Sequence, residues 1–195
     1  MKKSNISVFF PAYNEEENIP WLVSNACNFL DTVADKYEVI VVNDGSRDGT
    51  GEVAEKIAAE NSHVRVIHHP VNRGYGAAVR SGLKGAIYDL IFFTDGDGQF
   101  DITELTEFLN LIDTCDVVAG YRIKRKDPFY RLMNAWAYGT MINLMFGLNI
   151  RDIDCAFKLF KKSVIDEIDI EATGALASAE LLIKIKRKGY KIIQK

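Results

Sequence analysis

Hydrophobic positions fall into short apolar runs that alternate with longer segments of helical periodicity. The runs are rich in β-branched and aromatic residues, as buried strands are. They predict strands at 6–10, 38–42, 64–68, 90–94 and 117–119. The segments between them predict helices at 19–30, 52–60, 75–86 and 102–112. This alternation is typical of βαβ units around a mainly parallel central sheet flanked by helices, so we expect an α/β fold.

The pattern changes after Gly120. A basic segment at 122–131 leads into an apolar stretch at 132–148, which Asn134 and Asn143 interrupt. A stretch of about 17 residues with two amides is marginal for a membrane span, so we expect a helix on the protein or on a membrane surface.

A short strand at 156–160 and two helices at 164–168 and 179–188 are expected next. Ile192 and Ile193 indicate a further strand just before the last residue, so we expect a C-terminally truncated domain.

Composition and charge narrow the class of protein. With 48% hydrophobic and 26% charged residues, the chain is globular and not disordered. The net charge of −3 gives no overall attraction to nucleic acid, so a site for a polyanion must be local. The three cysteines form no CxxC pair, and no signal peptide or stretch of 18 apolar residues is present. We therefore expect a cytoplasmic location.

The most informative motif is an acidic loop after the strand at 90–94. Asp95 and Asp97 are separated by Gly96 and followed by Gln99, at the strand end where α/β sheets bind ligands. Each carboxylate would repel a diphosphate charge by about 4 kcal/mol at about 4 Å for an effective dielectric constant of about 20, so a cation must lie between them. Oxygen ligands favour Mg²⁺ or Mn²⁺. An ordinary Asp-Gly turn is the alternative.

A second acid, Asp44, ends the strand at 38–42. An acid at this place can accept hydrogen bonds from a ribose or a base edge. Tyr13 and Glu15 follow the first strand and would add a flat face and a second acceptor to the same pocket. A turn followed by a helix cap at Thr50 explains Asp44 equally well.

Two further features are less specific. Gly74 and Gly76 precede a helix that could favour an anion, although close packing of the loop is an equal alternative. No G-x-G-x-x-G follows the first strand, which disfavours a dehydrogenase. Glu180 is an acid on an apolar helix face, and it could orient other groups or act as a general base. It could also simply interact with the helix dipole beside a cap at Ser178.

The segments PAYNEEENI, VNDGSRDGT, NRGYGAAVRSG, TDGDGQ and RDIDCAFK together resemble the inverting glycosyltransferases of family two, which have the GT-A fold. The chain is similar to their dolichyl-phosphate mannose synthase and polyprenyl-phosphate glycosyltransferase branch, from Ile6 to about Tyr190. The resemblance implies a single catalytic domain at 1–195, with a nucleotide-sugar-binding half at 1–120 and an acceptor half at 121–195.

The resemblance also implies roles for individual residues. Asp95, Asp97 and Gln99 would hold Mg²⁺ or Mn²⁺, with Asp97 also catalytic. Arg122 and Arg131 would bind donor and acceptor phosphates. The residues expected to contact the nucleotide are Pro11, Tyr13, Glu15, Val42 and Asp44, beside Asp95 and Gly96 of the acidic loop.

The chain departs from this branch in two places. Ala156 stands where the branch has a glycine after Cys155, and a closing segment with a His, an Arg and a Ser is missing after the last strand.

We expect transfer of mannose or glucose from a GDP- or UDP-sugar to a polyprenyl phosphate at the cytoplasmic membrane face, with peripheral membrane contact and no nucleic acid partner. A lipid phosphate is already an anion and needs no general base, whereas a hydroxyl acceptor would need one. A family member with a hydroxyl acceptor is one alternative. A non-catalytic nucleotide-sugar-binding module is another, because the closing segment is missing.

Overall fold

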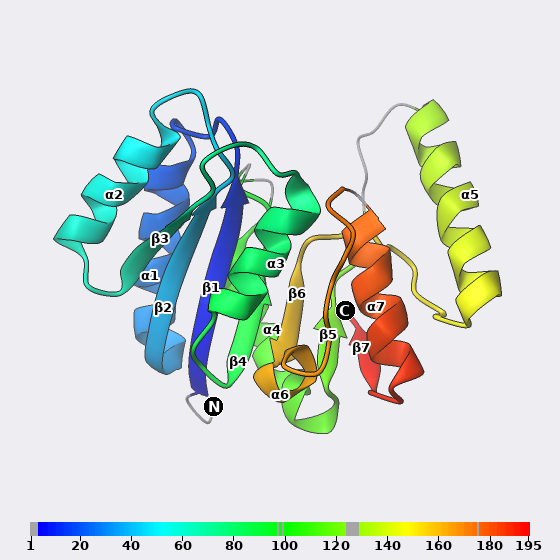
Figure 1. The fold of residues 1–195 in the computed structure, drawn as a ribbon. Coiled ribbons are helices and arrows are strands. Elements are labelled where there is room, and N and C mark those ends of the chain that lie inside the picture. Colours follow the sequence, from blue (N-terminus) through cyan, green and yellow to red (C-terminus); the bar gives the residue numbers. More distant parts are fainter. Residues whose placement is uncertain (1–3, 97, 99, 124–128, 175) are drawn as a thin grey trace.

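The computed structural model describes residues 4–96, 98, 100–123, 129–174 and 176–195. Among them, seven strands form one sheet in the order β3-β2-β1-β4-β6-β5-β7 (Figure 1). All neighbours are parallel except β6, which is antiparallel to both β4 and β5. The strands are β1 (Ser4–Ala12), β2 (Ala34–Asn43), β3 (Val64–His68), β4 (Leu90–Phe93), β5 (Val117–Ala119), β6 (Lys158–Lys161) and β7 (Ile192–Gln194).

Helices cover both faces of this sheet. They are α1 (Ile19–Val33), α2 (Thr50–Glu60), α3 (Tyr75–Gly85), α4 (Leu105–Leu111), α5 (Phe129–Phe146), α6 (Lys162–Ile165) and α7 (Leu176–Arg187), with the 3-10 turns η1 (Ile102–Glu104) and η2 (Ile112–Thr114). The mainly parallel sheet flanked by helices that the hydrophobic pattern predicts is confirmed.

Alternation along each strand divides the core into two layers. In β1, Val8 and Phe10 face the cluster built with α1, α2 and α4, whereas Phe9 faces the cluster built with α3, α6 and α7. Successive side chains of a strand point to opposite faces, so a strand buried on both sides reads as a continuous apolar run. The Phe9 ring stacks on Phe93 with centroids 5.2 Å apart, which joins β1 to β4.

The expected elements are present, with shifted ends. The helix expected at 102–112 begins as η1, where the Asp101 carboxylate accepts a hydrogen bond from the Thr103 backbone N–H at 2.9 Å. The strand expected at 156–160 starts only at Lys158, because the preceding residues form a loop. The strand expected at the end of the chain is β7, which pairs with β5.

Helix α5 lies at the edge of the molecule beside α7 (Figure 1). Ile142 packs with Ala179 and Leu182 of α7 in a small separate cluster. The opposite side of α5 is apolar and exposed, with 71% of Trp136 and 82% of Leu144 accessible to solvent. In the part of the chain that is described, no helix is long and apolar enough to cross a membrane.

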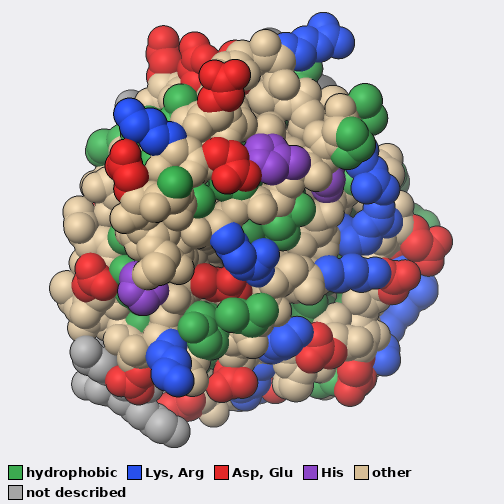
Figure 2. Space-filling model, turned by 60° about the vertical axis from the view of Figure 1, so that its left-hand side comes forward, with side chains coloured by type: hydrophobic (Ala, Val, Ile, Leu, Met, Phe, Trp, Pro, Cys, Tyr) green, Lys and Arg blue, Asp and Glu red, His purple; other side chains and the backbone are tan. Residues whose placement is uncertain are grey.

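Charged side chains of both signs are spread over the face seen in Figure 2. This distribution fits the small net charge of −3.

Candidate active site

A pocket of about 430 Å³ opens at the carboxyl ends of β1, β2 and β4, beside the start of α3. Parallel strands that end at one edge bring their following loops together, which is where α/β folds bind ligands. The lining includes six of the residues that the sequence assigned to the nucleotide: Pro11, Tyr13, Glu15, Asp44, Asp95 and Gly96.

The loops after β1 and β2 hold each other in place. Asn14 has a φ of +58°, a conformation that asparagine adopts more readily than most residues, and its side-chain oxygen accepts from the Arg47 N–H at 2.9 Å. The Glu15 N–H donates to the Thr50 hydroxyl at 2.8 Å. These contacts present Tyr13, with 39% of its surface exposed, on the wall of the pocket.

The Asp44 carboxylate also lines the pocket. It is almost fully buried and accepts from the backbone N–H groups of Arg73 and Gly74 at 2.9 and 2.8 Å. His69, which the sequence reasoning missed, places its Nδ1 2.5 Å from the same carboxylate and its Nε2 2.8 Å from the Ser81 hydroxyl. Asp44 therefore holds the backbone at 73–74 in place beside the pocket. Its carboxylate can still accept a hydrogen bond from a ligand.

Gly74 and Gly76 are required by close packing. A side chain on either residue would overlap the backbone of the segment at 172–173, and the Gly76 N–H donates to the Thr173 carbonyl at 2.8 Å. Gly74 also has a φ of +91°, which favours glycine. The sequence left two explanations for these glycines, anion binding at the start of a helix and close packing of the loop. The structure supports close packing.

Asp95 lies at the edge of the pocket next to Tyr75 of α3. Burial raises the pKa of the Tyr75 phenol, and the Asp95 carboxylate adds to the rise by its charge and by accepting a hydrogen bond. The phenol therefore stays protonated and can donate to Asp95.

Asp97 and Gln99 lie outside the described residues, and no group of three or more His, Cys, Asp or Glu residues suited to a metal occurs among the described ones. The acidic side chains on the pocket, Glu15, Asp44 and Asp95, all offer oxygen atoms. This donor chemistry fits a hard divalent cation such as Mg²⁺ or Mn²⁺.

Arg122 lies after β5, away from this pocket. Its Nε and Nη2 donate to the two oxygens of the buried Asp152 carboxylate at 2.8 and 3.0 Å, a bidentate pair that fixes the plane of the guanidinium. Arg122 lines two cavities, of about 530 and 460 Å³. Arg131 belongs to α5, but its side chain lies outside the described residues.

The smaller of these cavities contains a further arginine that the sequence reasoning missed. Arg151 places its guanidinium carbon 4.4 Å from the centre of the Tyr121 ring, and Tyr121 and Arg122 line the same cavity. Its place at the start of the RDIDCAFK segment was the available signal.

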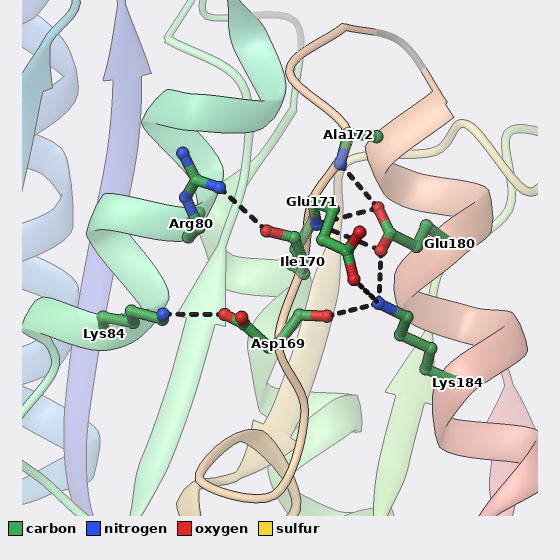
Figure 3. Close-up of polar contacts among 8 residues, drawn as sticks. All are labelled: Arg80, Lys84, Asp169, Ile170, Glu171, Ala172, Glu180 and Lys184. Atoms are coloured by element: carbon green, nitrogen blue, oxygen red, sulfur yellow. Dashed lines mark hydrogen bonds and ion pairs between the residues drawn. The ribbon is translucent and has the colours of Figure 1, made fainter.

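Glu180 does not line the pocket, and its side chain points toward the segment at 169–172 (Figure 3). Its carboxylate accepts from the N–H groups of Glu171 and Ala172 at 3.0 and 2.7 Å and pairs with Lys184 at 2.5 Å. Partial burial opposes ionisation, but the Lys184 and backbone hydrogen bonds prevail and lower the pKa of Glu180. A carboxylate held in this way is a weak base, so the geometry favours a positioning role.

Figure 3 also shows how the same segment is held from α3. The Arg80 guanidinium donates to the Ile170 carbonyl at 3.0 Å, and Lys84 pairs with Asp169 at 2.7 Å. The segment thus bridges α3 and α7 and continues to the Thr173 carbonyl that Gly76 contacts.

The structure does not bring the Val42 side chain to the pocket. Val42 is fully buried in β2 among the core residues that pack against α3. The reason is the strand's alternation, which turns this side chain into the core.

A central, mainly parallel sheet with this pocket at its edge defines a GT-A-type α/β protein. The family model for "Glycosyl transferase family 2" matches residues 7–169, and the chain belongs to that family.

Curated relatives include an undecaprenyl-phosphate mannosyltransferase from Micrococcus luteus, 29% identical over 97% of this chain and 81% of the relative. A dolichyl-phosphate beta-glucosyltransferase from Trichomonas vaginalis is 30% identical over 96% of this chain and 63% of the relative. Both names confirm the resemblance to polyprenyl-phosphate sugar transferases.

Among solved structures, glucosyl-3-phosphoglycerate synthase from Mycobacterium tuberculosis, crystallised with Mn²⁺, UDP and phosphoglyceric acid, matches with a TM-score of 0.77. The match covers 98% of this chain and 68% of that chain at 22% identity. It confirms the GT-A fold.

Proposed function

We propose that this protein is an inverting glycosyltransferase that moves a hexose, mannose or glucose, from a GDP- or UDP-sugar to a polyprenyl phosphate at the cytoplasmic face of a membrane. The observation that carries the proposal is the single pocket that gathers Tyr13, Glu15, Asp44 and Asp95 at the strand ends. The names of the two curated relatives support the lipid-phosphate acceptor.

In this proposal the pocket binds the nucleotide. The Tyr13 ring provides a face for the base, and Glu15 and Asp44 accept hydrogen bonds from the base or the ribose. Asp95, Asp97 and Gln99 would hold Mg²⁺ or Mn²⁺, and Asp97 would also take part in catalysis. When bound, such a cation neutralises the charge that develops on the leaving diphosphate. Tyr75 keeps the Asp95 carboxylate oriented by hydrogen bonding to it.

The proposed reaction needs positive charge from the acceptor half and no general base. An oxygen of the lipid phosphate attacks the anomeric carbon while the bond to the diphosphate breaks on the opposite side, so no proton has to be removed. Arg122 and Arg131 bind phosphate, since a guanidinium pairs with phosphate oxygens and stays charged at working pH. The engagement of both Glu180 oxygens by backbone N–H groups supports a reaction without a general base at this residue.

Helix α5 would place the acceptor half against the membrane. Its exposed apolar residues can enter the boundary between lipid headgroups and acyl chains, as interfacial helices do. The basic segment before the helix suits anionic headgroups.

The test uses the protein, Mn²⁺ and radiolabelled GDP-mannose, GDP-glucose, UDP-mannose or UDP-glucose with a polyprenyl phosphate. The matched control acceptor is the polyprenol with the same chain and a hydroxyl in place of the phosphate. Labelled lipid from the phosphate alone supports the proposal. Label on the polyprenol indicates a hydroxyl acceptor, whereas nucleotide binding with no transfer or donor hydrolysis indicates a binding module.

A further inference from the structure

Lys158 is a charged residue that no step of the proposed mechanism uses. It begins β6 and is fully buried. Its backbone pairs with Phe93 at the end of β4 and with Ala119 at the end of β5. These two strand ends lead directly to Asp95 and to Arg122. Lys158 therefore lies between the donor half and the acceptor half of the site.

The Lys158 ammonium group closes the loop that precedes its own strand. It donates to the carbonyls of Ile153, at 3.2 Å, and Cys155. The ammonium nitrogen also lies 5.6 Å from the centre of the Phe93 ring. An ammonium group has three N–H donors. Two of them are used by the carbonyls, and the Phe93 ring adds a favourable cation–π contact.

The same loop carries the residue that orients Arg122. Asp152 is buried and holds the Arg122 guanidinium through both carboxylate oxygens. Its carbonyl accepts from the Cys155 N–H at 3.4 Å, inside the turn that Lys158 closes. A continuous chain of contacts thus runs from Lys158 through the loop and Asp152 to Arg122.

The charge of Lys158 is costly and is compensated locally. Burial lowers the pKa of Lys158, while the Cys155 thiol and the carboxylates of Asp152, Asp154 and Asp95 oppose the decrease. Since an apolar residue of similar size avoids this desolvation cost, fold stability alone does not explain a lysine here.

We propose that Lys158 is a positioning residue of the acceptor site: it fixes the loop Asp152–Cys155 and thereby holds Arg122 in the orientation that receives the acceptor phosphate. This inference rests on the proposed function for the identity of the acceptor. It assigns to Lys158 no contact with either substrate.

The test compares Lys158→Met, which keeps the length of the side chain and removes its donors and charge, with Lys161→Met as a matched control. Lys161 is on the same strand but pairs with Asp116 at 3.5 Å, away from the loop. We expect Lys158→Met to raise the KM for polyprenyl phosphate about 10- to 100-fold, because small misplacements of a binding group have such effects. The Kd for nucleotide with Mn²⁺ should stay within about threefold, since the Tyr13 wall is untouched.

A second readout requires no turnover. Hydrogen exchange followed by mass spectrometry should become faster at 151–157 in Lys158→Met and stay unchanged in Lys161→Met. Lys158→Gln retains a donor without the charge, so its exchange at 151–157 should be slower, and its KM for polyprenyl phosphate lower, than those of Lys158→Met. If Lys158→Met does not fold, Lys158→Gln takes its place in the test.

Unchanged exchange at 151–157, or an equal loss of donor and acceptor affinity, would overturn the inference. Failure of the proposed function gives a different result, because the wild-type protein would then transfer no sugar to polyprenyl phosphate, while the exchange measurement still reports on the loop.

Discussion

At the scale of single residues, the acids of this protein divide by what they contact. The Asp44 carboxylate is engaged by two backbone N–H groups and His69, and Asp152 by Arg122. Asp95 has the Tyr75 phenol as a partner and lies on the pocket. Asp44 and Asp152 therefore both hold loops, and Asp44 in addition keeps acceptor capacity on the pocket.

Glu180→Gln tests this distinction. Because Gln retains an acceptor and the residue does not line the pocket, we expect kcat to fall less than about tenfold. A loss of several hundredfold would instead assign Glu180 the role of general base. The matched control is Glu171→Gln, a neighbour whose side chain is 84% exposed.

The stability difference between wild type and Glu180→Gln should depend on pH. Glu180 has a lowered pKa in the folded protein, so its ionised form contributes stability above its ordinary pKa of 4.5. That contribution is lost as the pH falls through the lower folded pKa. The difference in Tm between wild type and Glu180→Gln should therefore be constant from pH 7 to about pH 5 and shrink below that. A difference that grows on acidification would contradict the assigned direction.

At the scale of elements, the site depends on how closely α3 approaches the segment at 172–173. Gly76→Ala places a methyl group against the Ala172 carbonyl and the Ala177 side chain. We expect a loss of about 1–3 kcal/mol in the free energy of unfolding, measured by urea denaturation, as for other overpacked sites. The matched control is Gly139→Ala in α5, where an added Cβ would meet no other described segment of the chain within 4 Å and the substitution should stabilise by up to about 1 kcal/mol.

The exposed apolar residues of α5 predict binding of the protein to lipid vesicles through this helix. Trp136→Glu and Leu144→Glu remove apolar area from the side of the helix that faces solvent. If this face lies on lipid, each variant should bind vesicles containing anionic lipid at least about fivefold more weakly in co-sedimentation. Ile87→Glu, at an apolar residue outside α5 that is 63% exposed, is the control and should bind as the wild type does. Equal binding by all variants would rule out α5 as the contact.

At the scale of the whole molecule, the proposed donor site couples ligand binding to global stability. UDP or GDP with Mn²⁺, at about 100 times Kd, should stabilise the folded state by about 2.7 kcal/mol and raise Tm by roughly 5–10 °C. EDTA or Asp95→Asn should remove most of this shift, because the diphosphate then loses its cation. Asp113→Asn, an exposed acid in η2, is the control variant. A full shift in the presence of EDTA would contradict metal dependence.

Much of the fold could be predicted from the sequence, because strands buried on both faces leave long apolar runs. The extents of β1 and β2 could not, since pairing extends both strands into polar residues such as Ser4 and Lys36. For the site, the motif residues Tyr13, Glu15, Asp44 and Asp95 could be named in advance. His69 could not, because its contact with Asp44 joins residues distant in the chain, whereas Arg151 stands in the motif RDIDCAFK, which offered a signal for it.

The sequence by itself determined the succession of strands and helices along the chain, the α/β class and the family, since these depend on local periodicity and on contiguous motifs. Only the tertiary structure showed that Asp44 and Asp152 also hold loops and that Glu180 does not line the pocket. Asp44, Asp152 and Glu180 differ in the N–H groups and cations that the fold brings to them. Those partners lie nearby in space but, for Asp44 and Asp152, about 30 residues away along the chain.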